Sequence, residues 1–236
     1  MKPFNILKSW HYPNISHWQP EILNSLIQIN KLYHQNRGTI LDVGGGKAPF
    51  SLLVNISDYT YILVDPNVDS LKAAPNFIDK RKGYGEKLPI ESDSIDIIIT
   101  SSCLQYINQE EFFKECRRTL KAGGLIAVHE NGPLNPIILF ARLTQRLIGL
   151  VNRKHWHYRN TIKQYFVPKE IDGFTIKYKS ETGLITPILL CLQYFNIKEP
   201  KLLSDFLSRT DEVLLDRMSF LKRYTFLKIV IYKKNN

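Results

Sequence analysis

Short apolar runs alternate with helical patterns along the first part of the chain. The runs at residues 39–43, 59–64, 95–100 and 125–128 consist mainly of apolar and β-branched residues, and they predict buried strands. Most of them are followed by a helical pattern. Strands that alternate with helices form a parallel sheet with right-handed crossovers. The pattern therefore predicts an α/β fold, doubly wound around a mostly parallel sheet.

One predicted helix, between the last two of these strands, has clear boundary signals. Asn108 can cap its first turn, and Glu111 stands three residues later, as in many helix N-termini. We expect Gly123 and Gly124 to end this helix. An earlier helix is predicted after Pro20, where an apolar stripe begins.

The pattern changes after Glu130. Pro133 and Pro136 introduce an amphipathic helix over about 136–151, and the basic and aromatic residues 153–159 follow it. Farther along, the pattern predicts strands near 174–179 and 226–232 and a helix near 201–221. We expect these elements to complete the same sheet and to cover it with helical insertions.

The positive charge of the chain lies in its second part. The chain has 236 residues and a formal net charge of +10. Residues 1–136 carry 14 basic and 14 acidic side chains, and residues 137–236 carry the other 18 basic and 8 acidic ones. This asymmetry suggests different partners for the two parts, although a solvated lysine-rich surface would have the same composition.

Composition excludes several classes of protein. With 44% hydrophobic and 23% charged residues, the chain is neither a disordered nor a fibrous sequence. Its three cysteines show no metal-ligand spacing, so we assign no metal site and no disulfide framework, and we expect a reducing compartment. We see no secretory signal and no apolar run long enough to span a bilayer, so we expect a cytoplasmic protein.

The first strand ends in a glycine turn that an acidic residue precedes. Asp42 is followed by Gly44, Gly45 and Gly46. A phosphate-binding loop would need Ser or Thr after the lysine of this turn, and a dinucleotide fingerprint would need a glycine in place of Pro49. An amino-acid head group fits better, because the acid can accept from its ammonium group and the next helix N-terminus favours its carboxylate. A tight turn with an incidental acid is the alternative.

A second acid ends the next predicted strand. Asp65 lies 23 residues after Asp42, and neighbouring strand ends of a parallel sheet lie side by side. Its carboxylate can accept from both hydroxyls of a ribose, and Pro66 offers an apolar face to a base. The turn at residues 85–86 can close on the base edge, and Ser101 faces the same cleft.

Four segments carry these features in a fixed order: ILDVGGGKAPF, YILVDP, GEKLPIESDSIDIIITSSCLQYI and ECRRTLKAGGLIAVHE. The stretch from Ile40 to Glu130 resembles the class I S-adenosylmethionine-dependent methyltransferases of the type-11 methyltransferase domain group. The resemblance implies a Rossmann-like, seven-stranded sheet with helical insertions that form a cap. It also implies S-adenosyl-L-methionine as the cofactor and S-adenosyl-L-homocysteine as the product.

Carried over by position, the resemblance implies a set of cofactor-binding residues. In chain order they are Asp42, Gly44, Gly45, Gly46, Asp65, Pro66, Gly85, Glu86 and Ser101. The first acid and the glycines would cradle the methionine part, and the second acid would hold the ribose. The proline and the turn at residues 85–86 would contact the adenine, and the serine would form part of the cleft floor. Tyr84 and Gln105 stand where the family often has an acid and a histidine.

The resemblance also implies domain boundaries. Residues 1–36 would be an N-terminal leader and helix, and residues 37–236 the methyltransferase domain. Within that domain, residues 37–131 would bind the cofactor, and basic insertions at about 132–170 and 181–224 would form the substrate cap.

The expected reaction is a direct displacement at a methyl group carried by a sulfonium, helped by alignment and exclusion of water. An oxygen or nitrogen nucleophile would need its proton removed. His129, beside Glu130, is the candidate base, and a structural hydrogen-bonding role is the alternative. His155 and His157 are interpreted as part of a basic surface or lid.

The substrate is predicted less sharply. Residues 132–170 resemble segments of methyltransferases of lipid, quinone and surface-sugar pathways, so we expect a small-molecule or lipid- or sugar-linked acceptor, methylated at oxygen. The amphipathic helix, flanked by Arg142, Arg146 and Arg153, could lie on an anionic membrane at the inner membrane face or pack on the sheet. An RNA methyltransferase is the weaker alternative, and a cofactor-binding protein without catalysis is another. No obligate protein partner is predicted.

Overall fold

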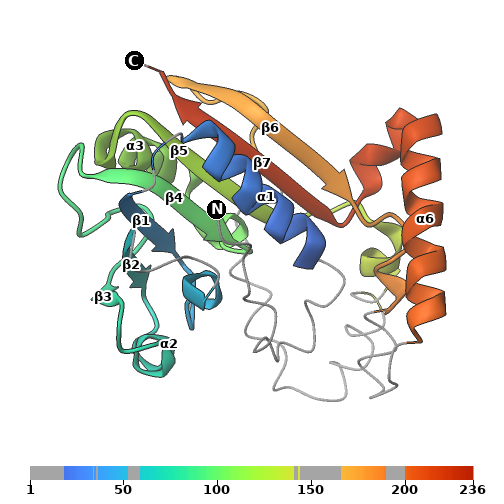
Figure 1. Ribbon diagram of the computed structural model, residues 1–236, viewed down its shortest axis with the longest axis horizontal. Coiled ribbons are helices and arrows are strands. Elements are labelled where there is room, and N and C mark those ends of the chain that lie inside the picture. The colour runs from blue at the N-terminus through green and yellow to red at the C-terminus, as the bar shows by residue number, and fades with distance from the viewer. Residues whose placement is uncertain are drawn as a thin grey trace.

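A single sheet runs through the protein. The computed structural model describes residues 19–33, 35, 37–52, 59–140, 143, 166–189 and 200–235. Its strands are β1 (Gly38–Val43), β2 (Tyr59–Asp65), β3 (Asp79–Lys82), β4 (Ile95–Ser101), β5 (Leu120–Asn131), β6 (Phe174–Thr182) and β7 (Leu227–Lys234). They form a seven-stranded sheet in the order β3-β2-β1-β4-β5-β7-β6 (Figure 1).

The pairing of the strands matches the predicted topology. The first five strands pair in parallel, and β7 inserts antiparallel between β5 and β6. The chain reverses its direction across the sheet at β1, which has β2 on one side and β4 on the other. The doubly wound, mostly parallel sheet is therefore confirmed, and the second part of the chain completes it.

Helices cover the two faces of the sheet. The described helices are α1 (Gln19–Leu32), α2 (Val68–Ala73), α3 (Gln109–Thr119) and α6 (Lys201–Arg217), with 3-10 turns η1 (Pro49–Leu52), η2 (Leu104–Tyr106) and η4 (Ser219–Tyr224). Leu26 and Ile29 of α1 join one core cluster, and Phe112 and Phe113 of α3 join the other. Because side chains alternate along a strand, each central strand contributes to both clusters.

The start of α3 is as predicted, but its end is not. The side chain of Asn108 accepts hydrogen bonds from the backbone N–H groups of Glu110 and Glu111. The helix ends at Thr119, and the two glycines that were expected to end it lie inside β5. Leu120 is fully buried and pairs with β4 in the extended conformation, so the strand begins before the glycines.

The elements after β5 are held together by buried polar side chains. Asn135 is fully buried, and its amide nitrogen donates to the carbonyl oxygens of Gly183, Leu184 and Tyr224. Its oxygen accepts from two backbone N–H groups at the start of the helical residues 136–140. One amide thus joins that helix to the ends of β6 and η4. The basic string 153–159, with His155 and His157, lies outside the described residues, as do Arg142 and Arg146.

Candidate functional site

The predicted cofactor residues meet at the carboxyl ends of β1, β2 and β4. Asp42 is fully buried near the end of β1. Tyr61 of β2 donates a hydrogen bond from its hydroxyl to Oδ2 of Asp42 over 2.7 Å. The other oxygen, Oδ1, is buried and has no hydrogen-bond partner among the residues that the structure describes. A buried carboxylate with one free oxygen is costly unless a ligand completes it.

The glycine turn that follows β1 lies against the end of β2. The N–H of Gly44 donates to the carbonyl of Val64 over 2.8 Å, and the N–H of Gly46 donates to Oδ2 of Asp65 over 2.9 Å. Gly44 and Gly46 have left-handed backbones, with φ angles of 69° and 59°. Glycine is the residue that takes this conformation at little steric cost. The turn therefore brings the two predicted acids to one place.

The three glycines are required for different reasons. A Cβ at Gly44 would overlap the sulfur of Cys103, and a Cβ at Gly45 would overlap the carboxylate of Asp42. At Gly46, a Cβ would meet none of the described residues within 4 Å. The backbone at this last glycine therefore faces open space, where a ligand can lie directly against it.

Asp65 is oriented by two backbone groups. In addition to the bond from Gly46, its Oδ1 accepts from the N–H of Asn67 over 2.8 Å. The side chain is buried, and the next residue, Pro66, is exposed. Each carboxylate oxygen can accept a second hydrogen bond, so the two backbone contacts fix the carboxylate without exhausting it.

The electrostatics at Asp42 favour a cation. Burial and the nearby carboxylate of Asp65 raise the pKa of Asp42 to about 7, against the lowering effect of the hydrogen bond from Tyr61. A positive group at the free oxygen Oδ1 would stabilise the ionised form. The ammonium group of an amino-acid head has this charge and the matching donors, so the site fits the methionine end of S-adenosylmethionine.

The turn that was predicted to contact adenine is fixed to α3. Oε1 of Glu86 accepts from the backbone N–H of Asn108 over 2.9 Å, and Gly85 packs against Ile107 and Phe112. The side chain of Tyr84, which replaces an acid common in the family, is 61% exposed. The structure therefore brings this turn to the strand ends through contacts on the α3 side of the sheet.

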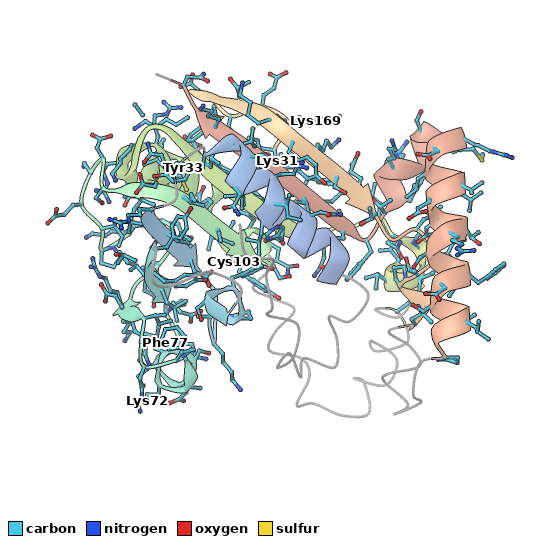
Figure 2. The ribbon with its side chains drawn as sticks, in the orientation of Figure 1. Lys31, Tyr33, Lys72, Phe77, Cys103 and Lys169 are labelled. Atoms are coloured by element: carbon cyan, nitrogen blue, oxygen red, sulfur yellow. The ribbon has the colours of Figure 1, made fainter. Side chains whose placement is uncertain are left out.

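The end of β4 forms another wall of this region. Ser101, the last residue of β4, is half-buried and pairs in register with His129 of β5. The next residue, Ser102, has a left-handed backbone with a φ of 51°, and its N–H donates to the carbonyl of His129. Cys103 follows at the same strand end (Figure 2) and packs against Gly44.

His129 lies in the core on the α1 side of the sheet. Its Nε2 is 2.8 Å from the hydroxyl oxygen of Ser25, and its ring stacks on Phe50 at 5.3 Å between centroids. Burial lowers the pKa of His129 to about 4, so the ring is neutral near neutral pH. The other nitrogen, Nδ1, is buried without a partner among the described residues. Its role as a proton acceptor stays a prediction.

Two side chains at this edge were missed in the sequence. Tyr61 opens the segment YILVDP but was given no role there, and its partner Asp42 is 19 residues away, so only the pairing of β1 with β2 brings them together. Glu130 was noted only as a neighbour of His129. A charged residue directly after the buried run of β5 was the available signal, because such a group needs a partner if it is buried.

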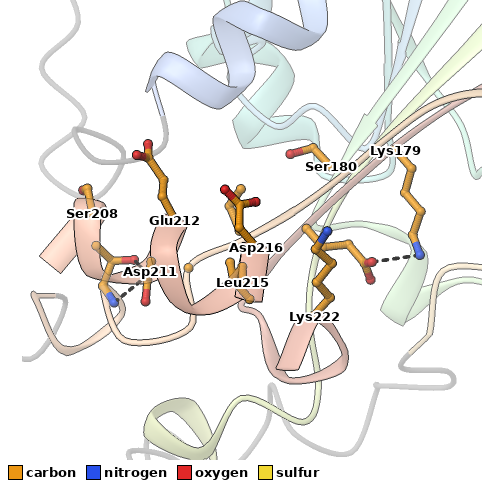
Figure 3. A pocket seen from close by; sticks show the side chains of 12 residues that line it. Lys179, Ser180, Ser208, Asp211, Glu212, Leu215, Asp216 and Lys222 are labelled. Carbon is orange, nitrogen blue, oxygen red and sulfur yellow. Dashed lines mark hydrogen bonds and ion pairs between the residues drawn. The ribbon is translucent and has the colours of Figure 1, made fainter. Parts of the chain in front are cut away.

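A cavity of about 470 Å³ lies between β6, α6 and η4 (Figure 3). Its lining includes the carboxylates of Glu181, Asp211, Glu212 and Asp216 and several hydroxyl groups. Glu181 pairs with Lys179 and Lys228, and Asp211 accepts from the N–H groups of Ile185 and Thr186. Thr182 at the end of β6 pairs with Leu227, which pairs with the end of β5, so the cavity lies near the same edge of the sheet as the cofactor residues, although β4, β5 and β7 separate β6 from β1.

Comparisons with known proteins point to one family. Residues 41–128 match the family model described as "Methyltransferase domain". An "uncharacterized methyltransferase" of Mycobacterium bovis is 31% identical over 136 residues, which are 50% of this chain and 52% of that protein. A 2-methyl-6-phytyl-1,4-hydroquinone methyltransferase of rice is 25% identical over 140 residues, 56% of this chain and 42% of that protein. The chain thus spans about half the length of the curated relatives it matches.

Solved structures agree on the fold. The crystal structure of an S-adenosylmethionine-dependent methyltransferase from Mesorhizobium loti superposes with a TM-score of 0.57 at 16% identity, over 89% of this chain and 96% of that chain. Residues 41–128 thus match a methyltransferase domain, and the chain has the fold of the class I S-adenosylmethionine-dependent methyltransferases. S-adenosylmethionine is the methyl donor of this class.

Proposed function

We propose that the protein transfers a methyl group from S-adenosylmethionine to a small-molecule or lipid- or sugar-linked acceptor, at an oxygen atom. The observation that carries the proposal is the buried Asp42, whose free oxygen stands beside a glycine turn open to a ligand. Within the described residues, neither Oδ1 of Asp42 nor the open space at Gly46 has a partner.

The residues of the site would divide the cofactor between them. Asp42 would accept from the ammonium group, and the glycine turn would hold the methionine backbone. Asp65, already oriented by Gly46 and Asn67, would accept from the ribose hydroxyls. Pro66 and the turn of Gly85 would cover the adenine. The bound cofactor supplies a methyl group on a good leaving group, so the protein mainly has to align the acceptor and exclude water.

The acceptor is proposed from weaker signs. The rice relative is named for a hydroquinone that carries a phytyl chain, which supports a hydroxylated acceptor with an apolar part. The cavity lined by Glu212 and Asp216 lies near the same edge of the sheet as the cofactor residues and offers hydroxyl and carboxylate groups to a polar acceptor. His129 is kept as the predicted proton acceptor for such an oxygen.

We also propose that the protein is cytoplasmic and makes peripheral contact with an anionic membrane. Among the described residues, no helix is both long and apolar enough to cross a bilayer. Large apolar side chains are nevertheless exposed on α6, at Leu202, Phe206 and Val213. Leu139 and Phe140 are also exposed, in the first turn of the helix that the sequence predicts to be amphipathic. The second part of the chain also holds the positive charge that would attract anionic lipid.

Calorimetric titration with S-adenosylmethionine tests the cofactor assignment, with NAD and ATP as control ligands. We expect selective binding by the wild-type protein. Asp65→Ala should bind the cofactor at least about tenfold more weakly, because the variant lacks the carboxylate that would accept hydrogen bonds from both ribose hydroxyls. Asp79→Ala is the matched control, since that exposed carboxylate is on β3 and, among the described residues, pairs with Arg81 of the same strand.

The titration, together with assays of methyl transfer and RNA binding, distinguishes the proposed function from its alternatives. Failure of a folded sample to bind S-adenosylmethionine would refute the proposed function. Tight binding without methyl transfer to any of a panel of hydroxylated acceptors would favour a cofactor-binding protein without catalysis. Salt-sensitive binding and methylation of RNA would favour the other alternative.

A further inference from the structure

The turn after β4 is held by one carboxylate from the end of β5. Oε1 of Glu130 accepts from the backbone N–H of Cys103 over 2.6 Å and from that of Leu104 over 2.7 Å. The side chain of Glu130 is buried. Hydrogen bonds from backbone amides to a buried charged acceptor are among the stronger ones in proteins, and an amide left without its acceptor is costly.

The turn needs such an anchor because its backbone is strained. Ser102 has a φ of 51°, a left-handed conformation that is strained for a residue other than glycine. Ala48, at the far end of the glycine turn, has a φ of 52°. The other described residue of this kind that is not glycine, Asp93, lies in the turn before β4. Strained backbone at two walls of one site is a common mark of a functional constraint.

The anchored turn forms a wall of the cofactor site. Cys103, whose N–H is held by Glu130, places its sulfur where a Cβ at Gly44 would stand. The turn after β4 and the glycine turn are therefore packed directly against each other. Any movement of Cys103 would change the space beside Gly44, where the methionine part of the cofactor is proposed to lie.

We propose that Glu130 is a positioning residue, which sets the shape of the cofactor site by fixing the turn of Cys103 and Leu104 against Gly44. The inference rests on the proposed function and adds to it a residue that does not touch the cofactor. Its action requires the length of the side chain and an acceptor oxygen, whereas a role as proton acceptor would require the carboxylate itself.

Three substitutions separate these requirements. Glu130→Gln keeps the length and an acceptor oxygen but loses the charge. Glu130→Asp keeps the charge but is one methylene too short to reach both amides. We expect Glu130→Gln to bind S-adenosylmethionine within about threefold of the wild type, and Glu130→Asp and Glu130→Ala to bind it about tenfold or more weakly.

Asp211→Ala is the matched control. Asp211 is also a buried carboxylate that accepts from two consecutive backbone amides, those of Ile185 and Thr186, but it belongs to α6, away from Gly44. Its loss should lower the melting temperature without changing cofactor affinity. If Glu130→Ala does not fold, the cofactor affinities of Glu130→Asp and Glu130→Gln still show whether Glu130 acts as a positioning residue.

Amide hydrogen exchange at Cys103 and Leu104 gives a readout that needs no cofactor. Exchange should be faster in Glu130→Asp than in Glu130→Gln and the wild type. Unchanged exchange and unchanged affinity in Glu130→Asp would overturn this inference and leave the proposed function intact. If Glu130→Gln binds the cofactor normally but no longer transfers the methyl group, the inference would be overturned, and Glu130 would act as a proton acceptor instead. A wild-type protein that binds no S-adenosylmethionine would overturn both proposals.

Discussion

The hydroxyl of Tyr61 donates to Oδ2 of Asp42, and the second oxygen of that carboxylate is buried without a partner in the described part of the chain. The pair therefore holds the carboxylate in place but leaves half of its acceptor capacity for a ligand. Since burial raises the pKa of Asp42 to about 7, the group changes its charge within the pH range in which the protein would work.

Cofactor affinity should rise with pH up to neutrality. An ammonium group binds to the ionised form of Asp42, and this form increases from a minority to a majority between about pH 6 and 7.5. We expect roughly a fivefold gain in affinity for S-adenosylmethionine from about pH 6 to pH 7, before an α-amino group with a pKa of about 7.7–8.0 loses much of its own proton. Calorimetric titrations at several pH values measure it.

Two variants check that Asp42 is the responsible group. Asp42→Asn should bind weakly and without this pH dependence. Tyr61→Phe removes a hydrogen bond that lowers the pKa of Asp42, so the rise in affinity should move to higher pH. The same rise in Asp42→Asn as in the wild type would show that another group titrates.

The open space at Gly46 predicts a separation of stability from binding. Gly46→Ala should cost about 1–2 kcal/mol of unfolding free energy, because alanine is strained at a φ of 59°. It should also weaken cofactor binding about tenfold or more, because the methyl group would stand where the ligand approaches the backbone.

Gly123→Ala is the control for Gly46→Ala. Gly123 has a φ of 73° and lies near the start of β5, at the opposite end of that strand from Glu130. Chemical denaturation should show a similar loss of stability in both variants, and calorimetry should show a loss of affinity only at Gly46. Equal affinities would mean that the glycine turn is a structural feature and not a cradle.

His129 should make the protein less stable in mild acid. Burial lowers the pKa of His129 to about 4, while the unfolded chain keeps the ordinary value near 6.5. The unfolded state therefore binds more protons between these two values, and stability is lost as the pH falls through this window. Each pH unit in it should cost up to about 1.4 kcal/mol.

The comparison with His129→Gln isolates this effect from the carboxylates nearby. Asp42 and Glu130 have raised pKa values and act in the opposite direction, but they are present in both proteins. Unfolding free energy should depend less steeply on acid pH in the variant. Parallel curves would contradict the assignment. The rate of methyl transfer by the same variant tests the predicted role as proton acceptor, since that role requires a large loss of kcat with normal cofactor binding.

The sequence was sufficient to predict the parts of the site that rest on local signals. Asp42 and Asp65 follow apolar runs, and parallel pairing of β1 with β2 had to bring their ends together. The cap at Asn108 was likewise a local pattern. These predictions needed only strand order and the geometry of one turn.

Contacts between distant segments could not be predicted in the same way. Asn135 joins carbonyl groups 48 to 89 residues away, and Glu130 reaches amides 26 and 27 residues before it. Nothing in the residues around either side chain indicates its partners. The end of α3 was missed because the burial of Leu120 in the sheet outweighed the helix-ending preference of the glycines after it.

The exposed face of α6 predicts how the protein would meet a membrane. Leu202, Phe206 and Val213 are four and seven residues apart and therefore share one side of the helix. The side chains of Leu202 and Phe206 are 85% and 65% exposed, which is unusual for large apolar groups on a surface helix. Arg209 and Arg217 lie close to this stripe in the helical projection, with Asp216 on its flank, so the face is apolar and bordered by both basic and acidic groups.

The double variant Leu202→Gln, Phe206→Gln should partition into anionic vesicles about thirtyfold more weakly than the wild type, since each apolar side chain contributes on the order of 1 kcal/mol at the interface. Phe77→Gln is the control, because Phe77 is 55% exposed but lies between α2 and β3. Cosedimentation with anionic and zwitterionic vesicles measures both. Equal partition of the two variants would remove α6 from the proposed membrane surface. If the wild type binds neither vesicle but forms a dimer that the double variant abolishes, the face is an interface between two copies of the chain.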